Sequence, residues 1–259
     1  MDAPHIAALL EPFLKQSLSE RQLDQVSIYI DLLLRWNARI NLTAIRNEPE
    51  IITRHFGESF FLASHLFPNG SSVARTLLSA NAGTAQQSTA SPPSNPRHPE
   101  ISQARREAST PSRPPQEVVA PRVLDIGSGA GFPALPIKIW APHIHLNMIE
   151  SNHKKAAFLR EVARALTLTN VHVITDRAEV VAKSHDAPQA EVVTLRAVEH
   201  LKVVLHQAVT FLAPTGSLAL LVGTAQLPSL TAIKSIQWQP PISIPESHSS
   251  VLLLGFMGK

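Results

Sequence analysis

Apolar residues recur at helical spacing through the first quarter of the chain. Ser19 and Gln22 have the separation of a capping box, and apolar side chains then return every three or four positions from Leu23 to Leu34. This pattern predicts a helix that begins after Ser19 and runs into Trp36.

A polar break at residues 37–43 separates this helix from a second one. Asn47 is followed three residues later by Glu50, with Pro49 between them, which marks a helix start. Apolar residues then continue towards Phe67. We therefore expect residues 1–68 to form an N-terminal helical cap that packs on the rest of the molecule.

Residues 69–120 differ from both flanking parts in composition. They contain no Phe, Tyr or Trp, and their prolines crowd into the second half. A segment of this kind buries too little apolar surface to offset the entropy lost on ordering. We interpret this segment as a disordered insertion. Its arginines could contact RNA, but a solvated loop is the favoured interpretation.

From residue 121 onward, short apolar runs alternate with helical patterns, which predicts a mostly parallel sheet. Helices are expected over residues 153–166 and 201–212. Strands are expected at residues 123–126, 146–150, 171–175, 191–196 and 217–222, with an antiparallel strand near the sheet edge at 251–256. The predicted fold class is α/β, with residues 121–259 forming a Rossmann-like, doubly wound sheet domain.

The stretch VLDIGSGAGFP, from Val123 to Pro133, joins the first strand to a loop with three glycines. Glycine tolerates positive φ angles and lets backbone amides approach a ligand closely. A ligand in such a fold binds at the carboxyl ends of the strands. Pro133 suits the first turn of a following helix.

The spacing of the glycines indicates which class of ligand the loop binds. Gly127, Gly129 and Gly131 read G-x-G-x-G after Asp125, whereas dinucleotide sites read G-x-G-x-x-G. The pattern is similar to motif I of class I S-adenosylmethionine (SAM)-dependent methyltransferases, which hold methionine and adenosine without phosphate. An acid about 20 residues further on binds ribose hydroxyls in related folds, and Glu150 stands there. An ordinary turn with an exposed glutamate is the alternative, which the coincidence of loop, strand and acid disfavours.

The composition limits which partners, locations and site chemistries this protein can have. The 259 residues are 44% hydrophobic with a formal net charge of +3, which permits an RNA partner without requiring one. We expect a soluble cytoplasmic protein, because there is no run of 18 apolar residues and no secretory leader. The chain has no cysteine, which excludes disulfides, thiolate zinc sites and a cysteine nucleophile. His143 and His145 form the nearest histidine pair, and no metal site is expected.

Several stretches together resemble one family, the RsmG/GidB 16S rRNA guanine-N7 methyltransferases of bacteria. Residues 36–43 resemble its W-N-x-x-x-N-L-T, and residues 54–59 resemble its R-H-x-x-D-S with Glu58 in place of the aspartate. Residues 125–133 resemble D-[IV]-G-[ST]-G-x-G-[FL]-P, residues 150–155 resemble D/E-S-x-x-K-[KR], and Arg196 with Ala197 resembles S-R-A. The resemblance covers about residues 16–68 and 121–258.

This resemblance implies SAM as methyl donor and a guanine as acceptor. The SAM-binding residues that follow from the resemblance and from the glycine loop are Asp125, Gly127, Gly129, Gly131, Phe132, Glu150, Ala178, Glu179 and Arg196. Arg196 is the residue expected to align SAM or guanine, and a structural salt bridge at a strand end is its alternative. Guanine N7 carries a free lone pair, so no general base is expected and positioning supplies the rate.

The implied partner is 16S rRNA or the small ribosomal subunit. We expect the protein to be a monomer. Candidate RNA contacts are Arg35, Asn37, Arg39, Asn41, Arg54, Lys154 and Lys155. Val222 and Ser247 stand where the family usually has basic residues, which removes charge that could touch RNA. A methyltransferase that acts on a small molecule or a protein stays open as an alternative, because a fold does not set its substrate. A non-catalytic RNA-binding module is disfavoured, because the sequence shows no face on which basic and aromatic residues alternate.

Overall fold

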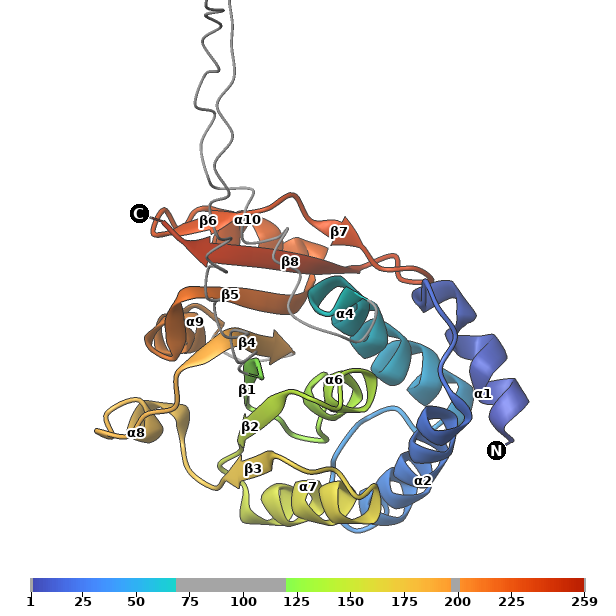
Figure 1. Cartoon of the computed structure of the whole chain (residues 1–259). Helices are drawn as coiled ribbons and strands as arrows, with labels where there is room; N and C mark the ends of the chain where they lie inside the picture. The colour runs from blue at the N-terminus through green and yellow to red at the C-terminus, as the bar shows by residue number, and fades with distance from the viewer. Residues whose placement is uncertain (1, 69–119, 197–200, 259) are drawn as a thin grey trace, which may run out of the picture.

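A computed structural model describes residues 2–68, 120–196 and 201–258 of the chain (Figure 1). The predicted disordered insertion, apart from residue 120, lies outside these described residues.

The centre of the described structure is one eight-stranded sheet with the order β3-β2-β1-β4-β5-β8-β6, and β7 pairs with β8 beside this path. Neighbouring strands from β3 to β5 are parallel, while β8 is antiparallel to β5, as predicted for the closing strand. The strands are β1 (Arg122–Ile126), β2 (His145–Ile149), β3 (Val171–Ile174), β4 (Ala190–Arg196), β5 (Leu212–Gly223), β6 (Ile236–Trp238), β7 (Ile242–Ser243) and β8 (Ser250–Met257). The sheet confirms the predicted α/β class.

The strand register brings the carboxyl ends of β1, β2, β3 and β4 to one edge of the sheet. Ile126, the last residue of β1, lies opposite Ile149 of β2 and Leu195 of β4. Ile149 in turn lies opposite Ile174 of β3. The strand order reverses between β1 and β4, and in open α/β sheets ligands bind at such a reversal.

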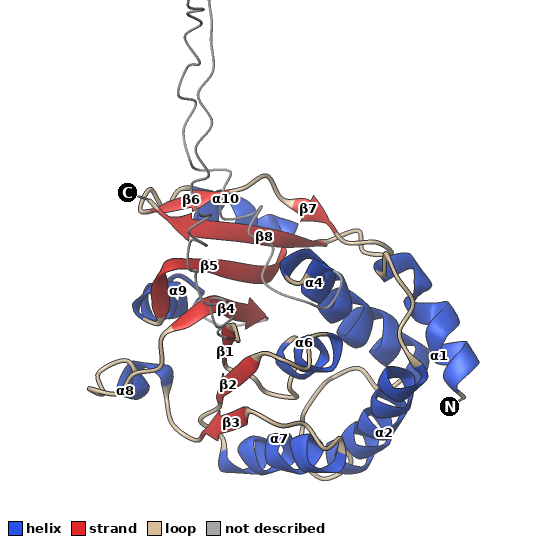
Figure 2. Cartoon of the chain, viewed as in Figure 1, coloured by secondary structure: helices blue, strands red, loops and turns tan. Residues whose placement is uncertain are grey.

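Helices cover both faces of the sheet (Figure 2). The helices after the first strand are α6 (Ala134–Trp140), α7 (His153–Ala165), α8 (Ala178–Val181), α9 (Leu201–Thr210) and, after the short η4 (Thr224–Gln226), α10 (Leu227–Thr231). In the view of Figure 2, α8 and α9 lie on one side of the strands, and α6 lies on the other with the N-terminal helices. Pro133 stands one residue before α6 as its N-cap, not inside the first turn.

The N-terminal region is helical, as its periodicity predicts. Its elements are α1 (Ala3–Leu10), η1 (Glu11–Phe13), α2 (Glu20–Asn37), α3 (Glu48–Glu50), η2 (Ile51–Gly57) and α4 (Glu58–Leu66). The predicted capping box is present, since Ser19 Oγ accepts from the Gln22 amide and Gln22 Oε1 accepts from the Ser19 amide. Asn47 caps the second helical segment, as predicted.

The second helical segment contains a feature that its sequence pattern does not indicate. Its middle, η2, is a π-helix of seven residues, and π-helical turns in proteins occur often at functional sites. Gly57 ends this turn against Phe13 of η1, and a Cβ on Gly57 would lie 2.7 Å from the Phe13 ring. The close approach therefore requires glycine there.

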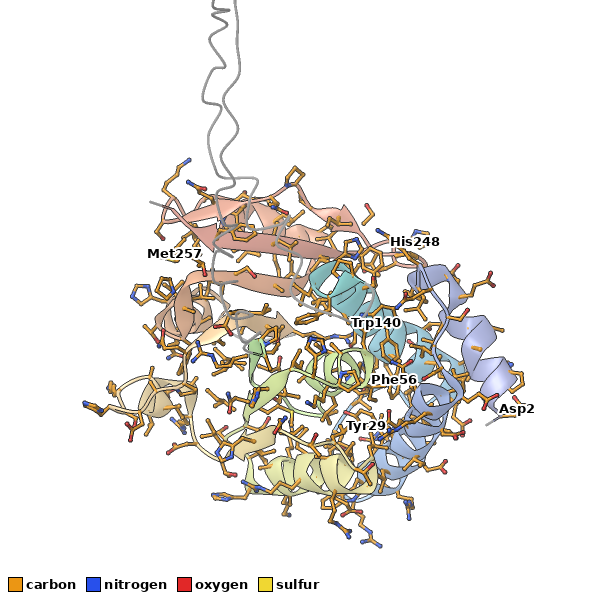
Figure 3. The ribbon with its side chains drawn as sticks, in the orientation of Figure 1. Asp2, Tyr29, Phe56, Trp140, His248 and Met257 are labelled. Atoms are coloured by element: carbon orange, nitrogen blue, oxygen red, sulfur yellow. The ribbon has the colours of Figure 1, made fainter. Side chains whose placement is uncertain are left out.

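The cap and the sheet share one hydrophobic cluster, which joins α2 and α4 to α6 and α7. Trp140 of α6 donates its indole Nε1–H to the Phe67 carbonyl at 2.9 Å, and Gln25 of α2 donates to the Leu166 carbonyl at 3.0 Å. Figure 3 shows Tyr29, Phe56 and Trp140 inside this packed region. Across residues 2–68, 120–196 and 201–258, no helix is long and apolar enough to cross a membrane.

Candidate cofactor and substrate site

The glycine loop begins directly at the end of β1. Gly127, Gly129 and Gly131 have φ angles of 71°, 54° and 87°, a region that side chains with a Cβ rarely adopt. The amides of Gly127 and Ser128 both donate to the Ile149 carbonyl, so the loop starts as an extension of the β1–β2 ladder. Gly127 is exposed at this point.

The glycines of the loop have different surroundings. A Cβ on Gly129 would meet only the Gly127 carbonyl, at 3.7 Å, so this side of the loop is open. A Cβ on Gly131 would lie 2.3 Å from the Tyr29 hydroxyl and 2.6 Å from Leu135. Gly129 therefore leaves room for a ligand, whereas Gly131 leaves room for the cap.

Glu150 follows the last residue of β2 and its carboxylate is fixed by two backbone amides. Oε2 accepts from the Gly129 amide and Oε1 accepts from the Asn152 amide, each at 2.8 Å. Each carboxylate oxygen keeps a further lone pair for a second donor, such as a ribose hydroxyl. The predicted ribose acid thus stands beside the glycine loop.

Asp125 lies beneath the loop. It is buried, and its Oδ1 accepts a hydrogen bond from Thr194 of β4 at 2.5 Å. Its Oδ2 has no hydrogen-bond partner among the described residues. Burial raises the pKa of Asp125 to about 7, against the lowering effect of its hydrogen bonds. Asp125 is placed to support the loop from inside the sheet.

Phe132 packs between two aromatic rings of the cap. The Tyr29 ring stacks on one side, with centroids 5.2 Å apart and planes at 3°, and the His55 ring lies at 4.7 Å and 18°. Phe56 meets Phe132 edge-on at 5.0 Å. The ring is buried by these contacts, and the SAM contact of Phe132 stays a prediction.

His55 lies in the π-helical turn and is a neutral imidazole at neutral pH. Burial, together with the positive charges of Arg196 and Arg54, lowers the pKa of His55 to about 3. Its Nε2 lies 2.7 Å from Thr43 Oγ1. Sequence reasoning missed His55 and Tyr29 as neighbours of the glycine loop, although His55 was part of the R-H motif.

Arg196, at the end of β4, turns towards the cap. Its Nη2 donates to Glu58 Oε2 at 2.7 Å and to the Arg54 carbonyl at 2.6 Å, and its Nη1 lies 3.4 Å from the His55 carbonyl. This is the structural salt bridge that the sequence offered as the alternative for Arg196. A role in aligning SAM or guanine stays a prediction.

Ala178 and Glu179 open α8, just after β3. Ala178 is buried, and Glu179 is half-buried with a carboxylate oxygen 3.8 Å from Arg177 Nη1. The register places them at the same edge of the sheet as Gly127 and Glu150. The predicted SAM residues other than Arg196 and Asp125 thus follow three neighbouring strand ends.

Comparison with known proteins decides the family. The model of the family described as rRNA small subunit methyltransferase G matches residues 22–74 and 114–238, well over half of the chain. The chain belongs to this family. The family resemblance predicted from the motifs is confirmed.

Named members of the small subunit methyltransferase G family agree. Ribosomal RNA small subunit methyltransferase G of Roseiflexus castenholzii is 36% identical over 208 residues, which cover 77% of this chain and 68% of that protein. The protein of the same name from Chloroflexus aggregans is 36% identical, with 78% and 64% covered. The one from Bacillus subtilis is 32% identical, with 72% and 58% covered. The match to the last two therefore spans less than two thirds of their lengths.

Solved structures match over a smaller part. A putative O-methyltransferase from Klebsiella pneumoniae has a TM-score of 0.46 and is 13% identical in sequence. The match covers 54% of this chain and 74% of that chain. MtNAS in complex with MTA and tNA has a TM-score of 0.46 and 16% identity, and covers 54% of each chain.

One of the residues predicted to contact RNA, Asn37, has a side chain that is engaged inside the protein. Asn37 is buried, its Oδ1 accepts from the amides of Leu42 and Thr43, and its Nδ2 donates to the Thr43 carbonyl. Its side chain shapes the loop and is not available at the surface. The other candidates remain accessible: Arg35, Arg39, Asn41, Arg54 and Lys154 are exposed, and Lys155 is half-buried.

The two departures from the family pattern differ in setting. Val222 is buried in β5 and belongs to the hydrophobic cluster on the α9 side of the sheet. Ser247 lies in the loop before β8, where its hydroxyl accepts from the Ser250 amide at 3.1 Å. Within the described residues, no group of three or more metal-ligating side chains could hold a metal ion.

Proposed function

We propose that this chain transfers the methyl group of SAM to N7 of a guanine in 16S rRNA. The observation that carries the proposal is the pairing of an open glycine loop with the fixed Glu150 carboxylate, in a member of the rRNA small subunit methyltransferase G family. The loop offers backbone without side chains, and the carboxylate offers acceptors for ribose, which fits an adenosyl ligand without phosphates.

The residues at the three neighbouring strand ends would hold the methyl donor. Gly127 and Gly129 would lie against it, Glu150 would accept from its ribose, and Ala178 with Glu179 would contact its adenine. SAM supplies an activated methyl group on a sulfonium. The methyl forms its bond to N7 as its bond to sulfur breaks, and the positive charge passes from sulfur to the guanine ring.

No proton needs to be removed from guanine, so the chain contributes positioning. Asp125 is buried beneath the loop and engaged by Thr194, and the Tyr29 hydroxyl is engaged by a backbone carbonyl. Holding the reacting atoms in line can by itself supply a large part of a rate enhancement.

The RNA would approach over the cap. Arg35, Arg39 and Arg54 are exposed on it, and Lys154 is exposed on α7. A base that is modified must first be extruded from its stack into the site. We propose that the protein does this as a monomer in the cytoplasm, on 16S rRNA or the assembled small subunit.

The test is methyl transfer from labelled SAM to small subunits and to naked 16S rRNA, both unmethylated, with the product mapped by strand cleavage at N7-methylguanosine. A single cleavage site is expected. Gly127→Ala should lose SAM binding because its φ is positive. Gly223→Ala is the matched control, since its Cβ would meet nothing closer than 3.6 Å.

Binding of SAM without transfer to either RNA would overturn the rRNA assignment. The protein would then be a methyltransferase for a small molecule or another protein. Absence of SAM binding in the wild type would overturn the cofactor assignment itself.

A further inference from the structure

A cavity of about 270 Å³ opens beside the end of β4, away from the glycine loop. It is lined by Phe13, Thr53, Arg54 and Glu58 from the cap and by residues 245–249. Figure 3 labels His248, one of these residues, close to α4. The cavity therefore joins the R-H-x-x-E-S stretch of the cap to the loop before β8.

The strand register fixes where this cavity lies on the sheet. Ser250, the first residue of β8, lies opposite Gly223 at the carboxyl end of β5, so residues 245–249 stand at that end. Arg196, at the carboxyl end of β4, bonds to Glu58. Most candidate SAM residues follow β1, β2 and β3. The cavity lies between cap residues next to Arg196, at the end of β4, and the loop that precedes β8 at the carboxyl end of β5. The two therefore flank the reversal in strand order, where donor and acceptor can meet.

Two carboxylates line this cavity, and Glu58 is the buried one, whereas Glu246 is exposed. Glu58 is 5% exposed, and its Oε2 accepts from Arg196. Its Oε1 accepts no hydrogen bond from the described residues. This oxygen is also not one of the fully buried polar atoms without a partner in that part of the chain. Burial raises the pKa of Glu58, and the charges of Arg196 and Arg54 oppose that rise. The Arg196 bond thus favours an ionised carboxylate held in one orientation.

We propose that this cavity receives the target guanine and that Glu58 accepts hydrogen bonds from its N1–H and its N2 amino group. The proposal rests on the function proposed above. Guanine presents these two donors side by side on its Watson–Crick edge, and a carboxylate offers two matching acceptors. Adenine has an acceptor at N1, so the same carboxylate would reject it.

This mode of reading leaves N7 free, because N7 lies on the opposite edge of the base from N1 and N2. An arginine that reads guanine through O6 and N7 would instead block the reacting atom. Methylation at N7 also places positive charge on the ring, which makes N1–H and the N2 amino group better donors. A fixed carboxylate there is complementary to the charge that develops during transfer. Arg196 is then a positioning residue that acts through Glu58.

The test compares guanosine with inosine, which keeps N7 and N1–H but lacks the N2 amino group. Both are placed at the mapped target position of a ligated RNA, and single-turnover methylation is measured with saturating SAM. The wild type should prefer guanosine by about tenfold or more, as expected for a hydrogen bond to a charged acceptor. Glu58→Gln should be slower on guanosine and should lose most of this preference, with its SAM dissociation constant changed less than about threefold.

Two further variants keep the result interpretable. Glu50→Gln removes another carboxylate of the same helical segment. Glu50 does not line the cavity, although it pairs at 3.3 Å with Arg54, which does, and the variant should keep the guanosine preference. Glu58→Asp retains a carboxylate and should restore part of the preference, even where Glu58→Gln fails to fold.

An equal rate on inosine and guanosine in the wild type would overturn the proposal. So would a Glu58→Gln variant that slows both RNAs by the same factor, because that result indicates a structural salt bridge alone. A wild type that binds SAM and methylates neither RNA would overturn the proposed function as well, which distinguishes the two failures.

Discussion

The hydroxyl of Tyr29 donates a 2.5 Å hydrogen bond to the carbonyl of Ala130, in the middle of the glycine loop. Both groups are buried, and the Tyr29 ring stacks on Phe132, the residue that follows the loop. On the other side of the loop, Glu150 holds the Gly129 amide. A loop whose glycines would otherwise be freely mobile is thus fixed from the sheet and from the cap together.

Tyr29→Phe should weaken SAM binding. It keeps the stacked ring but leaves the buried Ala130 carbonyl unpaired, which costs about 1–3 kcal/mol. We expect the SAM dissociation constant, measured by titration calorimetry, to rise about tenfold. Gln25→Met is the matched control, because Gln25 lies one turn earlier in α2 and donates a buried hydrogen bond to Leu166 instead. Equal weakening of SAM binding in both variants would show that Tyr29 acts only through stability.

Gly131→Ala should destabilise the fold. The new Cβ would lie 2.3 Å from the Tyr29 hydroxyl, and φ is +87°. We expect a loss of about 2–4 kcal/mol in the free energy of unfolding, measured in urea. Gly258→Ala is the control, since its Cβ would meet nothing closer than 3.5 Å. Because the hydroxyl is the closest obstacle, the loss in a double variant with Tyr29→Phe should be smaller than the sum of the two single losses.

Asp125→Asn should change how stability depends on pH. The pKa of Asp125 is raised from 3.8 to about 7 in the folded protein. Between these values the unfolded chain binds fewer protons, so this residue's contribution to stability is full below pH 3.8 and falls as pH rises towards 7. The slope is at most about 1.4 kcal/mol per pH unit. Urea unfolding should show the variant gaining stability relative to wild type from pH 5 to pH 8.

The comparison with wild type is needed because the lowered pKa of His55 gives the opposite slope between about pH 3 and 6.5. That contribution is common to both proteins and cancels in the difference. A difference in stability that stays constant from pH 5 to pH 8 would contradict the raised pKa of Asp125.

Arg196→Ala should cost about 3–5 kcal/mol of stability, because it leaves the buried Glu58 carboxylate unpaired. The double variant Arg196→Ala with Glu58→Ala should be more stable than Arg196→Ala alone, since no buried charge is left behind. Arg122→Ala removes the exposed pair with Glu191 and should cost at most about 1 kcal/mol. A double variant as unstable as the sum of its two single variants would show that Arg196 and Glu58 are not coupled.

Much of this molecule follows from local patterns in the chain. The capping box at Ser19, the helix that follows it, the alternation of strands and helices after residue 121, and the antiparallel last strand all agree with the structure. Glu150 stands beside the glycine loop, as its spacing from the loop predicts. Periodicity, caps and glycine spacing act over a few residues, so the sequence carries them directly. The short β6 and β7, of three and two residues, are too brief to show such a period.

The contacts that decide the site are of another kind. Arg196 meets Glu58 from 138 positions away, and Tyr29 meets Ala130 from 101 positions away. Whether Arg196 extends towards a ligand or pairs with the cap depends on where α4 packs, and no spacing in the chain records that packing. The sequence alone determined most of the elements, the glycine loop and the place of Glu150 beside that loop. Tertiary packing decided which side chains hold the loop and which side chains, such as those of Asn37 and Phe132, are buried. It also decided that Glu58 is the buried carboxylate of the cavity before β8. The physical reason is that burial and long-range hydrogen bonds form only when distant segments meet.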